Sequence, residues 1–339
     1  MENPTHNNNN NGNCSHTHST FRKPFIVFRV NSDGALAYAK QLISYLLTRF
    51  DIDALYCEDT SIINAITVFP GDQLLQSKYA SLFTAFDPQT QQSDICIILG
   101  GDGTCLWANI LYKNFTRPPF LTFHLGNLGY LAIYDINNFQ EVMNELFTID
   151  KGEDSERYFL EKRPLVECKI FNKGETGVVK EQLYAMNEML FERGQSLKML
   201  GFELCFNNEP LTQLWCDGLI FSTSTGSTAY NLSAGGPLMN YDVEGLIITA
   251  VCPFSLSFRP VVISKNIVIT IKTMKMSPEP RITKDGNSQL LLHENEYAEV
   301  KLSDMSVEFV VIHKFIKDRL QLWKMKLVNS LGWNNSFKH

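Results

Sequence analysis

Apolar and polar positions alternate in two different ways along the chain, and the first way predicts strands and helices in turn. Short apolar runs at residues 25–30 and 94–99 predict buried strands, and residues 35–50 carry apolar side chains at helical spacing. The alternation continues with a helix through Trp107 and Leu111, a strand at 119–124 and a helix at 136–147. Strands that alternate with helices are typical of a parallel sheet covered on both faces. Residues 23–150 are therefore predicted to form a Rossmann-like α/β domain.

The second kind of patterning begins near residue 151, where short apolar runs are separated by turn residues such as Asn172-Lys173-Gly174. The runs predict strands at 165–171, 201–206, 245–251, 261–264, 266–273 and 307–312. Many short strands joined by turns are typical of antiparallel sheets packed face to face. Residues 151–312 are therefore predicted to form a β-rich sandwich domain.

The two ends of the chain differ from these domains. Residues 1–22 are rich in asparagine and carry no apolar periodicity, so they are predicted to be a disordered tail. Within the final segment, 313–339, residues 315–327 show helical spacing together with basic side chains. This pattern predicts a C-terminal helix that packs back on a neighbouring domain.

Composition narrows the classes of partner. The 339 residues carry a net charge of −6 and no block of lysine or arginine, which argues against a nucleic-acid partner. No apolar run approaches the roughly 18 residues that a membrane-spanning helix needs. The first twenty residues also lack the apolar centre of a signal peptide. We therefore expect a cytoplasmic protein with no membrane partner.

A glycine-rich turn, Gly100-Gly101-Asp102-Gly103-Thr104, directly follows the predicted strand at 94–99. Glycines let the backbone turn tightly and approach a ligand, and the next helix would present free N–H groups to an anion. A carboxylate at such a place either holds a divalent cation or takes a proton from an attacking hydroxyl, and both roles belong to phosphoryl transfer. The turn therefore predicts a kinase. A purely structural βα connection with Asp102 as helix N-cap is the open alternative.

A second segment, residues 217–237, is rich in serine and threonine hydroxyls. Asp217 can accept a hydrogen bond from a sugar hydroxyl, and Tyr230 can lie against a flat base. The segment therefore predicts a site for a polar heterocyclic ligand, with an ordinary solvated loop as the alternative.

These two segments occur in order with Asn187-Glu188, residues 252–260 and Asp285-Gly286, and together they resemble the NAD kinase family over most of the chain. The resemblance implies transfer of the terminal phosphate of ATP, or of polyphosphate, to the adenosine-ribose 2′-hydroxyl of NAD to give NADP. It also implies Mg²⁺ arriving with the donor, no separate metal-ligand set, and assembly as a homodimer or homotetramer.

Carried over residue by residue, the resemblance makes Asp102 the catalytic base. It assigns the donor phosphates to Gly100, Gly101, Gly103 and Thr104. It assigns NAD binding to Asn187, Glu188, Asp217, Thr228, Ala229, Tyr230 and Ser233.

Three positions depart from the family pattern, and two other functions stay open. Phe254 stands where the family commonly has a histidine, and Tyr130 and Ala132 alter the segment after the third strand. A lipid or sphingoid-base kinase shares the glycine turn but calls for an acyl channel, which the hydroxyl-rich segment does not suit. A non-catalytic NAD-binding regulator has no use for the unpaired carboxylate of Asp102. Asp285-Gly286-Asn287 is predicted to be a hairpin turn of open function.

Overall fold

The computed structural model describes residues 21–28, 33–58, 81–112, 116–148, 157–174 and 177–334. The predicted N-terminal tail lies outside these ranges, apart from its last two residues. None of the helices within the ranges is both long and apolar enough to cross a lipid bilayer.

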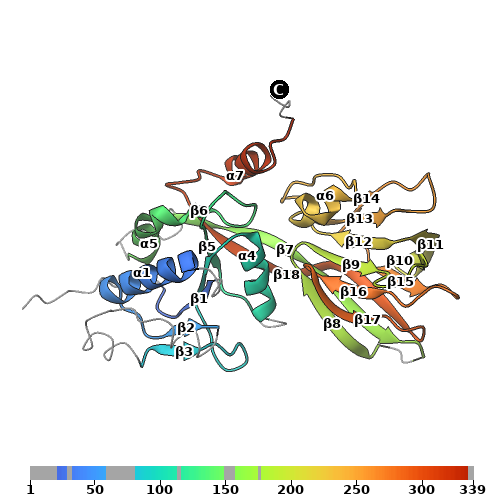
Figure 1. Cartoon of the computed structure of the whole chain (residues 1–339), viewed down its shortest axis with the longest axis horizontal. Helices are drawn as coiled ribbons and strands as arrows, with labels where there is room; N and C mark the ends of the chain where they lie inside the picture. The colour runs from blue at the N-terminus through green and yellow to red at the C-terminus, as the bar shows by residue number, and fades with distance from the viewer. Residues whose placement is uncertain are drawn as a thin grey trace, which may run out of the picture.

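The N-terminal part is the predicted α/β unit (Figure 1). Five strands pair in parallel in the order β5-β4-β1-β2-β3, and β6 pairs with β5. The bounds are β1 (Pro24–Phe28), β2 (Leu55–Cys57), β3 (Phe83–Ala85), β4 (Ile95–Leu99), β5 (Phe120–His124) and β6 (Tyr134–Asp135). Both β1 and β4 are fully buried along their length, as expected for strands covered on two faces.

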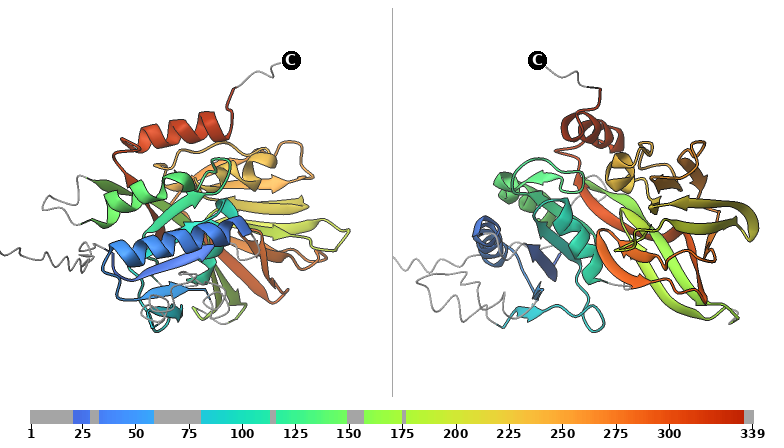
Figure 2. Two further views of the ribbon diagram at one scale, coloured as in Figure 1. Left: turned by 60° about the vertical axis from the view of Figure 1, so that its left-hand side comes forward. Right: turned by 45° about the vertical axis from the view of Figure 1, so that its right-hand side comes forward.

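Helices cover this sheet on both faces. They are α1 (Asp33–Arg49), α4 (Asp102–Leu111) and α5 (Phe139–Phe147), the last preceded by the 3₁₀ turn η1 (Ile136–Asn138). The chain leaves β1 through α1 toward β2 on one side, and leaves β4 through α4 toward β5 on the other. Because such crossovers are right-handed, α1 and α4 lie on opposite faces (Figure 2). The order of the strands therefore reverses between β1 and β4, and ligands of such sheets bind where it reverses.

The C-terminal part is a sandwich of two sheets. One has six antiparallel strands in the order β14-β13-β12-β9-β16-β17. These strands are β14 (Val261–Ser264), β13 (Gly245–Val251), β12 (Gly218–Ser222), β9 (Glu188–Glu192), β16 (Arg281–Lys284) and β17 (Asn287–Leu291). The facing layer is built from β7 (Tyr158–Asn172), β8 (Val179–Ala185), β10 (Leu200–Phe206), β11 (Glu209–Cys216), β15 (Ile269–Thr273) and β18 (Glu296–Ile312). A separate apolar core fills the space between the two sheets.

Two long strands join the two parts. β7 has 15 residues and β18 has 17, and they pair antiparallel along most of their length. Near its end β18 also pairs in parallel with β5, at Phe309 and Phe120. One twelve-stranded sheet therefore runs from the α/β part into the sandwich. The division of the chain at residues 150 and 312 stays a prediction.

The predicted C-terminal helix is α7 (Arg319–Met325), followed by the π-helical turn η4 (Lys326–Ser330). Asp318 caps α7, because its carboxylate accepts a hydrogen bond from the Gln321 N–H at 2.8 Å. The Trp323 ring meets the Tyr241 ring edge-on with centroids 4.9 Å apart. The helix therefore packs back on the molecule as predicted.

Candidate active site

Asp102 begins α4 at the carboxyl end of β4, where the strand order reverses. Its side chain makes no cap bond to its own helix. The carboxylate instead accepts hydrogen bonds from the backbone N–H groups of Tyr130 at 2.8 Å, Leu131 at 2.8 Å and Ala132 at 3.3 Å. The N-cap interpretation of Asp102 is therefore wrong, and the carboxylate is held by a loop that follows β5.

Two glycines make this arrangement possible by leaving room for side chains. A Cβ atom on Gly129 would lie 2.3 Å from Asp102 Oδ1, and one on Gly100 would lie 2.2 Å from Thr104 Oγ1. Cβ atoms on Gly101 and Gly103 would meet nothing within 4 Å. The glycine turn is thus packed on one side and open on the other, toward the free N–H groups that begin α4.

Lys326, from the turn after α7, lies beneath the loop that holds Asp102. Its Nζ donates hydrogen bonds to the carbonyl oxygens of Gly129 at 2.5 Å and Ala132 at 3.0 Å. The side chain is completely buried. Burial lowers the pKa of Lys326 to about 7, although the negative charge of Asp102 opposes the shift.

A second group of polar residues gathers at the start of β9. Asp285 accepts backbone hydrogen bonds from Met186 at 2.8 Å, Asn187 at 2.7 Å and Glu188 at 3.3 Å. Asp285 and Gly286 have positive φ angles of 45° and 76°, so the predicted hairpin turn is confirmed. Sequence reasoning left the function of Asp285 open, and its side chain turns out to hold the backbone of the Asn187-Glu188 pair.

Glu188 shares a buried environment with Asp285. Burial raises the pKa of Glu188 to about 8, and the charge of Asp285 adds to the shift. Burial also raises the pKa of Asp285 to about 6, although its three backbone donors oppose this. Glu188 Oε2 has no hydrogen-bond partner among the described residues. At neutral pH a protonated Glu188 therefore offers an O–H donor as well as an acceptor.

The hydroxyl-rich segment is buried rather than solvated. Thr223 Oγ1 donates to the Met186 carbonyl at 2.6 Å, Ser227 Oγ to Ser224 at 2.7 Å and Thr228 Oγ1 to Thr225 at 3.2 Å. These hydroxyls therefore hold the loop itself, and the solvated-loop interpretation is wrong.

The same segment also packs against the Asn187-Glu188 pair. A Cβ atom on Gly226 would lie 2.0 Å from the Asn187 carbonyl oxygen, so only glycine fits there. The two motifs are thus held in direct contact.

Other predicted NAD-binding residues lie around Tyr230. Tyr230 and Ser233 begin and end the short helix α6 (Tyr230–Ser233), directly after Thr228 and Ala229. Tyr230 is 41% exposed, which leaves part of its ring free to contact a ligand. Burial raises the pKa of its hydroxyl, and nearby acidic groups add to the shift, namely those of Glu192, Cys252, Glu188 and Asp217. Glu188 of β9, Asp217 just before β12 and Tyr230 of α6 therefore interact electrostatically.

The connection after α4 carries Arg117, whose charge interacts with that of Asp285. Burial lowers the pKa of Arg117 to about 10, opposed by Tyr184, Tyr112 and Asp285. Arg117 follows α4 in the chain, and Asp102 begins α4. In Figure 1, α4 lies on the side of the parallel sheet that faces the sandwich.

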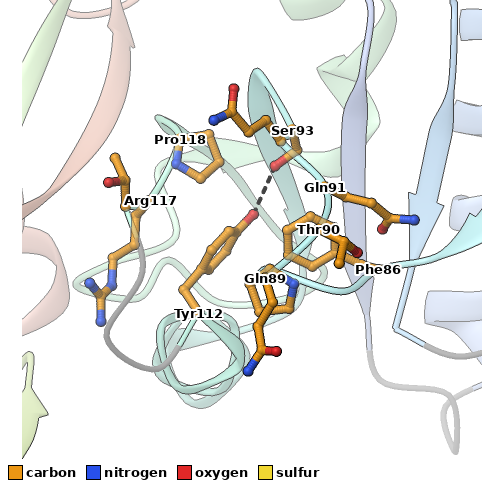
Figure 3. Close-up of a pocket in the computed structure, with 11 residues that line it drawn as sticks. Phe86, Gln89, Thr90, Gln91, Ser93, Tyr112, Arg117 and Pro118 are labelled. Carbon is orange, nitrogen blue, oxygen red and sulfur yellow. Dashed lines mark hydrogen bonds between the residues drawn. The ribbon is translucent and has the colours of Figure 1, made fainter.

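A cavity of about 550 Å³ lies at the other end of α4 (Figure 3). Its lining includes Phe86, Tyr112 and Arg117, and the hydroxyls of Ser93 and Tyr112 lie 3.0 Å apart. None of the predicted site residues lines it, so it is separate from the groups around Asp102 and Glu188. Within the described ranges, no group of three or more His, Cys, Asp or Glu side chains is arranged to hold a metal ion.

Comparison with known proteins identifies the family of this chain. Residues 25–151 match the ATP-NAD kinase N-terminal domain, and residues 186–312 match the ATP-NAD kinase C-terminal domain. The chain is 31% identical to the mitochondrial NADH kinase pos5 of Schizosaccharomyces pombe over 309 residues, covering 87% of this chain and 75% of that protein. The chain belongs to the NAD kinase family.

Other NAD kinases agree with this assignment. The NAD kinase of Flavobacterium johnsoniae is 32% identical over 253 residues, covering 74% of this chain and 81% of that protein. The solved yeast NADH kinase complexed with NADH has a similar fold, with a TM-score of 0.82, 24% identity, and coverage of 94% of this chain and 89% of that one. An NAD kinase from Archaeoglobus fulgidus in complex with ATP aligns with a TM-score of 0.58 at 20% identity, covering 89% and 98% of the two chains. The α/β domain followed by a β-rich domain is thus the fold of solved NAD kinases.

Sequence reasoning did not assign Lys326 to the candidate site, and it left Asp285 without a role. Lys326 stands in an ordinary basic helix pattern, and Asp285 in an ordinary turn pattern. The Phe254 side chain, which replaces the histidine common in the family, is 76% exposed.

Proposed function

We propose that this NAD kinase family member transfers the terminal phosphoryl group of ATP, or of polyphosphate, to the adenosine-ribose 2′-hydroxyl of NAD, giving NADP, with Asp102 as general base. The observation that carries the proposal is the placement of the Asp102 carboxylate at the sheet's reversal point, fixed by three backbone donors. Asp102 Oδ2 accepts one of these bonds, and a carboxylate oxygen has room for a second. That lone pair is free to accept the proton of the attacking hydroxyl.

Donor phosphates fit the open side of the glycine turn. Gly101 and Gly103 leave space there, and the N-terminus of α4 supplies free N–H groups and a favourable dipole. Gly100 and Thr104 pack together behind the turn and fix its shape. An ATP complex of the Archaeoglobus fulgidus relative supports ATP as the donor.

Mg²⁺ fits a site of this kind, because it binds proteins through one or two carboxylates together with substrate phosphates. The half-buried carboxylate of Asp102 beside the open turn is such a donor set. The ion would neutralise charge on the transferred phosphoryl group.

The dinucleotide is expected to bind along Asn187, Glu188, Asp217 and the segment 228–233. A neutral Glu188 donates to a ribose hydroxyl, Asp217 accepts from another polar group, and the exposed part of the Tyr230 ring packs against a base. Relatives named NADH kinase pos5 and ATP-NADH kinase YEF1 of Saccharomyces cerevisiae support NADH as a second acceptor to test.

A homodimer or homotetramer in the cytoplasm completes the proposal. The edge strand β14 exposes Val261 and Val262 at 45% and 50%, and such an edge is suited to pairing with another chain. Light scattering after size-exclusion chromatography tests the assembly, and cell fractionation tests the location.

The deciding experiment follows NADP formation from NAD, ATP and Mg²⁺ through a coupled NADP-specific dehydrogenase. Asp102→Asn keeps the size of the side chain but removes the base, so kcat should fall about 100-fold to 10,000-fold while the Kd for NAD changes little. Asp304→Asn, at an exposed carboxyl, is the matched control and should keep the parent rate.

Turnover of Asp102→Asn near the parent rate would show that another group is the base. A parent protein that phosphorylates sphingosine and not NAD would favour the lipid kinase. A protein that binds NAD without turnover would favour the regulator.

A further inference from the structure

One peptide group connects Lys326 with Asp102. The Tyr130 N–H donates to Asp102 Oδ2 at 2.8 Å, and the Gly129 carbonyl of the same peptide accepts from Lys326 Nζ at 2.5 Å. Lys326 also donates to the Ala132 carbonyl at the far end of the loop, at 3.0 Å. The ammonium therefore holds both ends of the short segment whose N–H groups hold the carboxylate.

The two bonds on this peptide reinforce each other. A cation that donates a hydrogen bond to the carbonyl oxygen polarises the peptide group. The N–H of that peptide is then a stronger donor to the negative carboxylate. Charge-assisted hydrogen bonds of this kind are shorter and stronger than neutral ones. The arrangement is therefore expected to fix the position of the carboxylate.

The buried position of Lys326 is costly, and its two carbonyl acceptors offset part of that cost. The side chain is completely buried, and burying an ammonium costs several kcal/mol unless it is paired. The groups that face it are Asp102 and Cys105 on α4 and Arg163 on β7. Asp102 supplies the compensating negative charge, because Arg163 is another cation and Cys105 is a buried thiol whose pKa is raised.

Local structure fixes the lysine in place. It begins the π-helical turn η4, a rare geometry that is frequent at functional sites. The preceding helix is anchored by the contact between Trp323 and Tyr241 and by the buried Leu322. Lys326 therefore reaches the loop from a fixed backbone.

We propose that Lys326 is a positioning residue for Asp102, whose carboxylate it holds in a fixed orientation through the Gly129–Tyr130 peptide. The inference rests on the proposed role of Asp102 as base. Lys326 contacts no reacting atom, and it acts on the reaction through the loop that holds Asp102.

The test compares variants of Lys326 in the full-length enzyme. Lys326→Met keeps most of the apolar stem and loses the charge, so kcat should fall about 10-fold to 100-fold while KM for NAD and ATP changes less than about 3-fold. Lys326→Arg keeps a positive charge and hydrogen-bond donors at this position, so it should restore part of kcat. Lys324→Met, at an exposed lysine of α7, should match the parent.

A parent-like kcat in Lys326→Met would overturn the proposal, and so would a loss of kcat accompanied by an equal rise in KM. If Lys326→Met fails to fold, Lys326→Gln replaces it, because glutamine keeps an N–H donor without the charge. A parent-like kcat in Lys326→Gln would likewise overturn the proposal. Asp102→Asn distinguishes a failure of the base assignment from a failure of the role proposed for Lys326. If Asp102→Asn abolishes turnover and Lys326→Met does not lower it, the base assignment stands and only the role of Lys326 fails.

Discussion

At the scale of single residues, the carboxyl groups of Glu188 and Asp285 are the most unusual pair in the described structure. Both are buried, and their pKa values are raised to about 8 and about 6. Asp285 has three backbone donors, whereas Glu188 has an unpartnered oxygen. The pair is therefore expected to carry a proton at neutral pH, and the proton belongs mainly to Glu188.

Replacing Glu188 with glutamine should make stability less sensitive to pH. Because the folded state binds a proton more tightly than the unfolded state, Glu188 stabilises the fold below about pH 4.5, and this contribution is lost as pH rises toward about 8. Glu188→Gln has no such loss. Its melting temperature should equal that of the parent near pH 5 and exceed it by about 3 °C or more at pH 8.

Differential scanning fluorimetry of the ligand-free protein between pH 5 and pH 8.5 measures this difference. Glu209→Gln, at an exposed carboxyl of β11, should show a constant difference from the parent across that range. A constant difference for Glu188→Gln as well would mean that Glu188 ionises normally in the folded state.

Residues whose signal is local could be predicted from the sequence, and residues defined by distant contacts could not. The glycine turn at 100–104 follows a buried strand directly, so the sequence indicates both the position of the turn and the importance of Asp102. Lys326 meets Gly129 across 197 positions, and Asp285 meets Glu188 across 97. Nothing near either residue in the sequence reveals such a partner, because the partner is chosen by the fold.

At the scale of elements, α7 depends on its contacts and on its cap. A helix of seven residues is too short to be stable alone in water. Its N-cap is Asp318, and Leu322 is the residue of α7 buried within the described structure. The cap and the packing of α7 therefore decide how firmly Lys326 is held.

Removing the cap should loosen α7 selectively. Asp318→Ala loses the bond to the Gln321 N–H and should cost about 1 kcal/mol, which corresponds to roughly 5-fold faster hydrogen exchange of the α7 amides. Asp318→Asn keeps a capping oxygen and should exchange like the parent. Amides of β12 serve as an internal reference, and equal acceleration there would mean that the substitution destabilises the whole molecule instead.

Elements with strong periodicity were predicted well. The helix expected at 35–50 is α1 (Asp33–Arg49), and the strand at 94–99 is β4 (Ile95–Leu99). The strand at 307–312 is only the end of β18, which begins at Glu296. The missed part alternates buried and partly buried side chains, but it includes the buried Glu296, whose carboxylate pairs with Lys180 of β8. A charged residue at a buried position interrupts the apolar pattern of a strand, so the sequence alone does not show that the strand continues through it.

At the scale of the whole molecule, the two parts share strands rather than a linker. β7 and β18 pair from one apolar core into the other, and Phe309 of β18 packs against Phe120 of β5 with ring centroids 5.7 Å apart. If one part unfolded alone, both strands would have to break their pairing in the middle. The described molecule is therefore expected to unfold as one cooperative unit, although two-domain proteins often do not.

Core substitutions in either part test this expectation. Ile97→Ala lies in the α/β core and Leu219→Ala in the sandwich core, and both side chains are completely buried. Each should cost about 2–5 kcal/mol. Hydrogen exchange at increasing urea, read separately at β4 and β12, should give one shared midpoint in the parent and one lower shared midpoint in each variant. If Ile97→Ala lowered the midpoint of β4 and left that of β12 unchanged, the shared strands would not couple the two cores. The Asp102 loop and the Glu188 site would then be parts of domains that open independently.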